Sequence, residues 1–139
     1  MNHFREKTSS DTNYVTIKDG NGCSSSVGMR GGQQWLTLRQ SGCYSKSTIQ
    51  HEFIHAMGFD HVQSRPDRDQ YVDIVWDNIY DSLYFNYKRQ DNALTYNVPY
   101  DGRSFMHYRA QTNFNIEYME PSIISKVNTK VFPVSVASP

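Results

Sequence analysis

The chain has 139 residues, 14 basic and 14 acidic side chains, and 37% hydrophobic residues. This length suits one domain with a moderate core. The balanced charge, without a basic run, argues against a nucleic-acid partner. No apolar run approaches the roughly 18 residues of a membrane span, and no signal peptide is visible in the polar N-terminal segment.

Two β-strands are predicted in the first third of the chain, at 13–22 and 31–42, each bounded by turn-forming glycines. The intervening segment 23–30 is expected to form a short extended edge. Cys23 and Cys43 lie at the two ends of this region. They form either a disulfide, which implies an oxidising compartment, or two unrelated reduced thiols.

The periodicity then changes, and a helix is predicted at about 48–57. Ser47 with Gln50 fits a capping box at its start, and Gly58 fits a left-handed cap at its end. The residues expected to share its apolar face are Ile49, Phe53, Ala56 and Met57.

The remainder of the chain is predicted to be rich in loops. Residues 59–70 are charged and irregular, 71–79 are extended, and 80–90 form a short helix. From Asn92 onward, Asn, Pro and Gly dominate, so mostly loop is expected. The tail 127–139 resembles neither a helix nor an element that closes a core.

The stretch HEFIHAMGFDH, His51–His61, holds three of the five histidines. His51 and His55 are four residues apart, so on a helix their imidazoles lie one above the other and can meet one ion. Glu52 lies beside them, displaced enough to miss the metal and close enough to take a proton from a water on it. This pattern predicts a zinc hydrolase site.

Gly58 can end the helix in the left-handed conformation, and the resulting turn can bring His61 back to the same ion. Three neutral histidines leave a fourth position open, which distinguishes a catalytic zinc site from a structural one, and they favour zinc over Mg²⁺ and Ca²⁺. The full pattern arises in only about one shuffled chain in 10⁵. A helix with incidental histidines is therefore the weaker interpretation.

The pattern H-E-x-x-H-x-x-G-x-x-H is the metzincin signature, and the residues after it resemble the astacin family of zinc endopeptidases. Those in register with the family are Gln63, Arg65, Asp67, Arg68, Asp69, Tyr71, Val72, Trp76, Asn78 and Ile79. The segment SFMHY, 104–108, resembles the family's Met-turn. The resemblance implies that Met106 packs beneath the zinc, and that Tyr108 ligates zinc at rest and swings away to hydrogen-bond the oxyanion. Without the upstream motif, the two would be interpreted as a core methionine and an ordinary aromatic residue.

The resemblance extends upstream, where 20–43 is similar to the family's edge strand and the strand that follows it. It implies that a Cys23–Cys43 bridge joins them. It also implies that an extended substrate pairs antiparallel with the edge strand. The residues expected at that contact are Ser24, Ser25, Ser26 and Val27.

The chain departs from the family pattern in three places. Val62 replaces a glutamate that, in the family, receives the mature N-terminal ammonium through water; valine cannot accept that hydrogen bond. The first long helix is matched only in part, and the strand and cysteine expected after it are missing. The C-terminal helix and its cysteine are unmatched as well, so the chain is expected to be truncated at both ends.

The sequence predicts an α+β fold of the metzincin, zincin-like type: one partial catalytic domain over 1–139. Its upper part, 1–58, is expected to hold a small mixed sheet and the active-site helix, and its lower part, 59–139, to be loop-rich. The function implied is a secreted zinc endopeptidase that binds one Zn²⁺ per chain and acts on a protein or peptide substrate. The alternative is a truncated, non-catalytic remnant that binds zinc or peptide without turnover.

Overall fold

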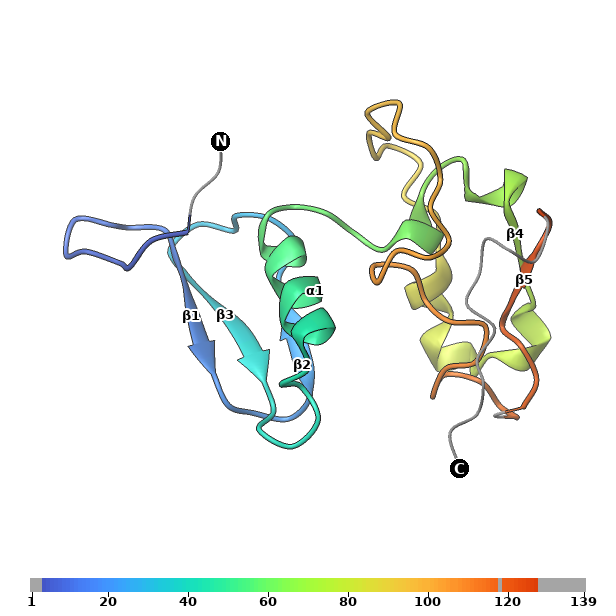
Figure 1. Cartoon of the computed structure of the whole chain (residues 1–139), viewed down its shortest axis with the longest axis horizontal. Helices are drawn as coiled ribbons and strands as arrows, with labels where there is room; N and C mark the ends of the chain where they lie inside the picture. Colours follow the sequence, from blue (N-terminus) through green and yellow to red (C-terminus); the bar gives the residue numbers. More distant parts are fainter. Residues whose placement is uncertain (1–3, 118, 128–139) are drawn as a thin grey trace. The chain divides into compact units, whose positions relative to one another are not determined.

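The computed structural model of the protein describes residues 4–117 and 119–127. The chain divides into two compact units, Met1–Asp60 and His61–Pro139. Figure 1 shows a sheet and one helix in the first unit, and short strands, helical turns and long loops in the second. Within the described ranges, no helix is long and apolar enough to cross a membrane.

The first unit contains a three-stranded mixed sheet with the strand order β1-β3-β2. Its strands are β1 (Tyr14–Lys18), β2 (Cys23–Ser25) and β3 (Gln33–Leu38). β1 runs parallel to β3 and β2 runs antiparallel to it, so β2 forms one edge of the sheet. Both predicted strands are confirmed, although they are shorter than 13–22 and 31–42 because their outer residues belong to the flanking turns.

Helix α1 spans Lys46–Ala56 and begins two residues earlier than predicted. The prediction of Ser47 as the capping residue is wrong. Ser45 is the N-cap, and its Oγ accepts a hydrogen bond from the backbone N–H of Thr48 at 3.1 Å. Nearby serines offer the same capping chemistry, which is why sequence does not separate them. Gly58 has a φ of +104°, which confirms the left-handed turn after the helix.

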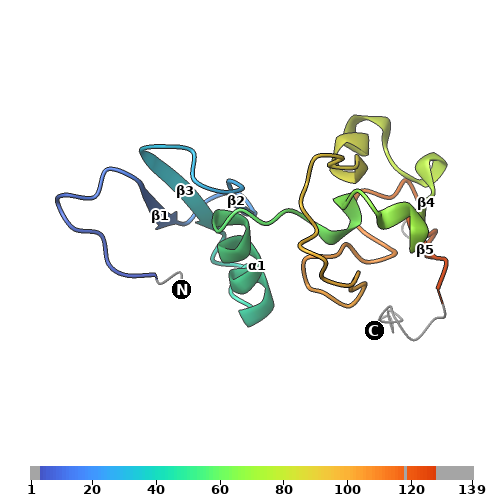
Figure 2. The same cartoon turned by 90° about the horizontal axis from the view of Figure 1, so that it is seen from above.

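A small hydrophobic core joins β3 to α1. Leu36 and Leu38 of β3 are buried, and Ile49 and Phe53 of α1 pack against them. Figure 2 shows α1 along one face of the sheet. The prediction of Met57 on this apolar face is not met, since Met57 is 40% exposed because the helix ends one residue before it.

A disulfide joins Cys23 in β2 to Cys43, ahead of α1. The structure therefore supports the bridge over two separate thiols. Cys43 is fully buried within the core of this unit. Since the bridged residues are 20 positions apart, the bridge restricts the unfolded chain and contributes roughly 3 kcal/mol to stability.

The second unit consists of short elements. They are the 3₁₀ helices η1 (Val62–Ser64), η2 (Arg68–Gln70), η3 (Trp76–Asn78) and η4 (Asp81–Tyr87), and the strands β4 (Val72–Ile74) and β5 (Ile123–Ser125). The prediction of an extended segment at 71–79 is correct only at β4, and the predicted short helix is the 3₁₀ helix η4. β5 has no counterpart among the predicted elements, and it pairs antiparallel with β4. The tail predicted at 127–139 lies outside the described residues from 128 onward.

The core of the second unit is partly polar. Its buried apolar residues are Val72, Ile79, Tyr87, Tyr100 and Ile123. Arg68 is 5% exposed. Its Nη1 donates hydrogen bonds to the carbonyls of Gln63, at 2.9 Å, and Tyr87, at 2.8 Å. The guanidinium of Arg68 therefore links η1 to η4, because a side chain with several N–H donors can bond to a carbonyl of each helix.

Candidate active site

Two histidines on α1 direct their nitrogens to the same point. The Nε2 atoms of His51 and His55 are 3.0 Å apart, and the two ring centroids are 4.6 Å apart. His51 is half-buried and His55 is buried. The spacing of four residues accounts for this convergence, since one helical turn places the two side chains on one face.

The backbone beyond the helix fixes the tautomer of His55. Its Nδ1 lies 2.8 Å from the carbonyl of Phe59. A carbonyl can only accept, so Nδ1 carries the proton and Nε2 keeps the lone pair that a metal needs. The turn at Gly58 makes this contact, because it brings the Phe59 carbonyl back over the last turn of the helix. The backbone N–H of Gly28 also donates to the His55 carbonyl at 2.8 Å.

His61 follows the same turn. The ring nitrogens that His51, His55 and His61 can offer to an ion all lie within 4.8 Å of one another. Nitrogen ligands around a tetrahedral zinc lie about 3.3 Å apart. The three imidazoles therefore fit one zinc ion after a small adjustment of their rings.

Glu52 is a buried acid, 5% exposed. Its Oε2 has no hydrogen-bond partner among the described residues. Burial raises the pKa of Glu52 from an ordinary 4.5 to about 7. A buried carboxyl group with a spare oxygen and a pKa near neutrality, beside two histidines, is a typical feature of a functional site.

The second unit brings Tyr108 and Met106 to the segment that begins with His61. The rings of Tyr108 and His61 have centroids 4.5 Å apart. Met106 is buried, and its carbonyl accepts a hydrogen bond from the N–H of Val62 at 2.9 Å. Val62, in place of the family's glutamate, packs against the hydrophobic core of this unit.

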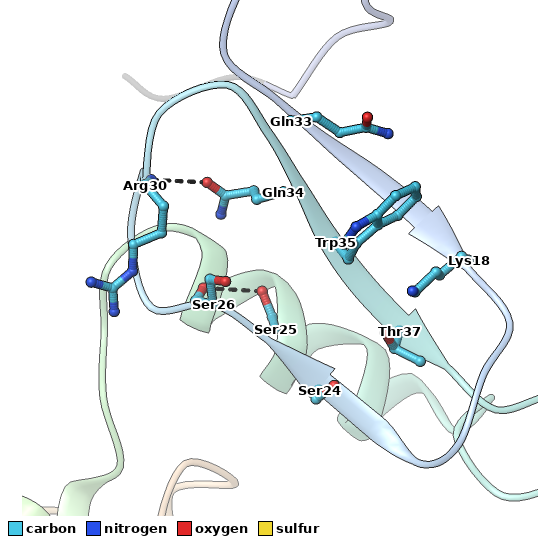
Figure 3. A pocket seen from close by; sticks show the side chains of 9 residues that line it. All are labelled: Lys18, Ser24, Ser25, Ser26, Arg30, Gln33, Gln34, Trp35 and Thr37. Carbon is cyan, nitrogen blue, oxygen red and sulfur yellow. Dashed lines mark hydrogen bonds between the residues drawn. The ribbon is translucent and has the colours of Figure 1, made fainter.

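The edge expected to bind substrate is shorter than predicted. Ser24 and Ser25 belong to β2, whereas Ser26 and Val27 follow it in a non-strand segment. Ser24, Ser25 and Ser26 line a hollow of about 490 Å³ that is open to solvent (Figure 3). The other residues that line it are Lys18, Arg30, Gln33, Gln34, Trp35 and Thr37.

Three residues beside Tyr108 are absent from the site that the sequence predicts. The backbone N–H of Tyr108 donates to Oε1 of Gln63 at 3.0 Å. Nδ1 of His107 donates to the Tyr108 carbonyl at 2.5 Å, and Nε2 of His107 accepts from the hydroxyl of Tyr100 at 2.6 Å. Gln63 is itself one of the positions that match the motif, and His107 lies within the segment 104–108, but neither pattern indicates a role beside Tyr108. Nothing in the sequence connects Tyr100 to them.

Comparisons with known proteins find a matching family model and several relatives. The family model for astacin, a family of peptidases, matches residues 2–133. The chain is 40% identical over 125 residues to high choriolytic enzyme 2 of Oryzias latipes, which covers 90% of this chain and 44% of that protein. It is 43% identical over 121 residues to human meprin A subunit beta, covering 85% of this chain and 17% of that protein.

A solved structure is also similar. It is high choriolytic enzyme 1, a hatching-enzyme zinc protease from Oryzias latipes, which matches with a TM-score of 0.84 and 37% identity. The match covers 91% of this chain and 62% of that one. The chain spans about half the length of the curated choriolytic enzymes that it matches.

Proposed function

We propose, from the premise that this chain belongs to the astacin family of zinc metallopeptidases, that it hydrolyses internal peptide bonds of proteins with one bound zinc ion. The observation that carries this proposal is the convergence of three histidine side chains within 4.8 Å, next to a buried acid. Family membership supplies the reaction class, and the convergence supports these residues as the ones that perform it.

The zinc ligands that we propose are His51, His55 and His61. Their donor set supports zinc, because three neutral imidazoles suit this ion better than the hard cations that prefer oxygen. The hydrogen bond from His55 Nδ1 to the Phe59 carbonyl supports it further, because it frees Nε2 as a ligand atom. One zinc ion held there would supply Lewis-acid polarisation of water and of the scissile carbonyl.

Glu52 is the general base and acid in this proposal. Its carboxylate accepts a proton from the attacking water as the water oxygen bonds to the carbonyl carbon. It then gives that proton to the leaving nitrogen as the carbon–nitrogen bond breaks. The spare buried oxygen and the pKa of about 7 support this role, since a group that transfers protons in both directions works best near the ambient pH.

Tyr108 is the second catalytic residue. In this proposal its hydroxyl donates a hydrogen bond to the oxyanion that develops on the carbonyl oxygen. The contact between its ring and His61 supports the assignment, because it places the ring beside a proposed ligand. The side chain of Met106 is buried, and its carbonyl accepts a hydrogen bond from the N–H of Val62, which links Met106 to the segment that begins with His61.

The substrate is a protein or peptide segment in extended conformation. We propose that it adds as an antiparallel strand to β2 near Ser24–Val27. The position of β2 at the edge of the sheet supports this, because an edge strand offers backbone groups to an incoming chain. The disulfide and the family together support secretion into an oxidising compartment.

Zinc-dependent cleavage of casein tests the proposal. The wild-type chain should cleave casein, and a chelator should abolish the cleavage. Glu52→Ala should lower the rate at least about 100-fold, whereas the matched control Glu6→Ala, at an exposed site, should not. Zinc binding without cleavage by the wild-type chain would instead indicate the non-catalytic remnant.

A further inference from the structure

Two segments of the second unit are joined by hydrogen bonds on both sides of the Met-turn. The N–H of Val62 donates to the carbonyl of Met106 at 2.9 Å, and the N–H of Tyr108 donates to Oε1 of Gln63 at 3.0 Å. The first bond joins backbone to backbone. In the second, a side-chain amide takes the place of a backbone carbonyl, so it depends on the identity of residue 63.

The position of Gln63 is fixed by burial and by a hydrogen bond to its backbone. It is fully buried, and its own carbonyl accepts a hydrogen bond from the buried guanidinium of Arg68. Because Tyr108 supplies a donor, the acceptor Oε1 must face it. Nε2 has no hydrogen-bond partner among the described residues. Burying an amide nitrogen without a partner costs stability. Within the described part of the chain, the hydrogen bond of this side chain is the one to Tyr108.

The carbonyl of Tyr108 also bonds to a buried side chain. His107 is buried, and its Nδ1 donates to that carbonyl. This fixes Nε2 as the acceptor for the Tyr100 hydroxyl. The ring of Tyr100 stacks on Tyr71 with 4.5 Å between centroids. Both backbone polar groups of Tyr108 therefore bond to buried side chains.

We propose that Gln63 and the Tyr100–His107 pair are positioning residues, which hold the backbone of Tyr108 in register with the segment after His61. This inference rests on the proposed role of Tyr108 in hydrolysis. The Tyr108 ring is half-buried, with Tyr87 and Phe114 both 5.6 Å away between centroids. With its backbone fixed, Tyr108 reaches the oxyanion by side-chain rotation alone, so its hydroxyl keeps a defined path.

The test is Gln63→Met in the full chain. This variant keeps the length and apolar volume of the side chain but removes the acceptor, and Gln70→Met, at an exposed position of the same unit, is the control. The exchange rate of the Tyr108 amide proton should rise about tenfold in Gln63→Met. The kcat value should fall at least about tenfold with KM and zinc content unchanged, because only a contact to the transition state weakens.

The outcomes separate this inference from the proposed function. An unchanged exchange rate of the Tyr108 amide proton overturns the claim that Gln63 holds the Tyr108 backbone. Faster exchange with unchanged kcat overturns the positioning role. If the wild type does not cleave peptides, the proposed function fails. The exchange rate of the Tyr108 amide proton still decides whether Gln63 holds the Tyr108 backbone.

A second variant covers the case in which Gln63→Met does not fold. Tyr100→Phe keeps the stacked ring and removes only the hydroxyl. The ¹⁵N shifts of His107 should then show mixed tautomers in place of one, and kcat should fall about threefold or more with unchanged KM. One unchanged tautomer with unchanged kcat overturns the inference.

Discussion

Replacing Glu52 with glutamine should stabilise the zinc-free protein, and only above a defined pH. The pKa of this buried group is raised from 4.5 to about 7. A difference of about 2.5, at about 1.4 kcal/mol for each pKa unit, corresponds to about 3.5 kcal/mol, which partial solvation of the carboxyl group lowers to about 3 kcal/mol or less. Because the folded state binds the proton more tightly than the unfolded state, stability falls as pH rises through this window. The cost is absent below pH 4.5 and complete above about pH 7.

The assay is urea unfolding with a chelator present, for wild type and Glu52→Gln. Glutamine carries no charge, so the variant should be up to about 3 kcal/mol more stable at about pH 8 and equal to wild type near pH 4.5. The two proteins differ only at position 52, so the difference between them removes the contribution of every other side chain. An equal difference at both pH values, or a variant less stable at the higher pH, would refute the reasoning about burial.

Other variants test the scaffold around the site. Replacing both Cys23 and Cys43 with alanine should cost roughly 3 kcal/mol of unfolding free energy; an unchanged urea midpoint would show that the bridge does not restrict the unfolded chain. Gly58→Ala should cost about 1–2 kcal/mol because of its φ of +104°, and should weaken zinc binding in equilibrium dialysis. Arg68→Met should lower the free energy of unfolding by about 3 kcal/mol, because the carbonyls of Gln63 and Tyr87 lose their hydrogen-bond donor. An unchanged midpoint of thermal unfolding would contradict this role of Arg68.

The part of the site that lies on α1 was predictable because it depends on local chemistry. Helical spacing brings His51 and His55 together, and a glycine at position 58 permits the turn after them. The same local rules failed over the choice of cap, where Ser45 acts in place of Ser47. Ser45 and Ser47 offer the same side-chain acceptor, so sequence alone does not distinguish them.

The part of the site in the second unit depends on contacts between distant residues. The hydrogen bond from Tyr108 to Gln63 joins residues 45 positions apart. The strand β5 pairs with β4, which lies far from it in the sequence. Neither has a periodic pattern that sequence can register. Family resemblance pointed to Tyr108 as a candidate site residue. It matched Gln63 only as a family position and gave no sign of the hydrogen bonds that Gln63 and His107 make to the Tyr108 backbone.

The central claim is that three histidines bind one zinc ion, and metal analysis of the dialysed protein tests it most directly. Wild-type protein should retain one zinc per chain. His55→Ala and His61→Ala should each lose it, because two imidazoles hold zinc far less tightly than three. The control His3→Ala changes a histidine outside the proposed ligand set and should retain the metal. Wild-type protein without zinc, or undiminished zinc in His55→Ala and His61→Ala, would contradict the account.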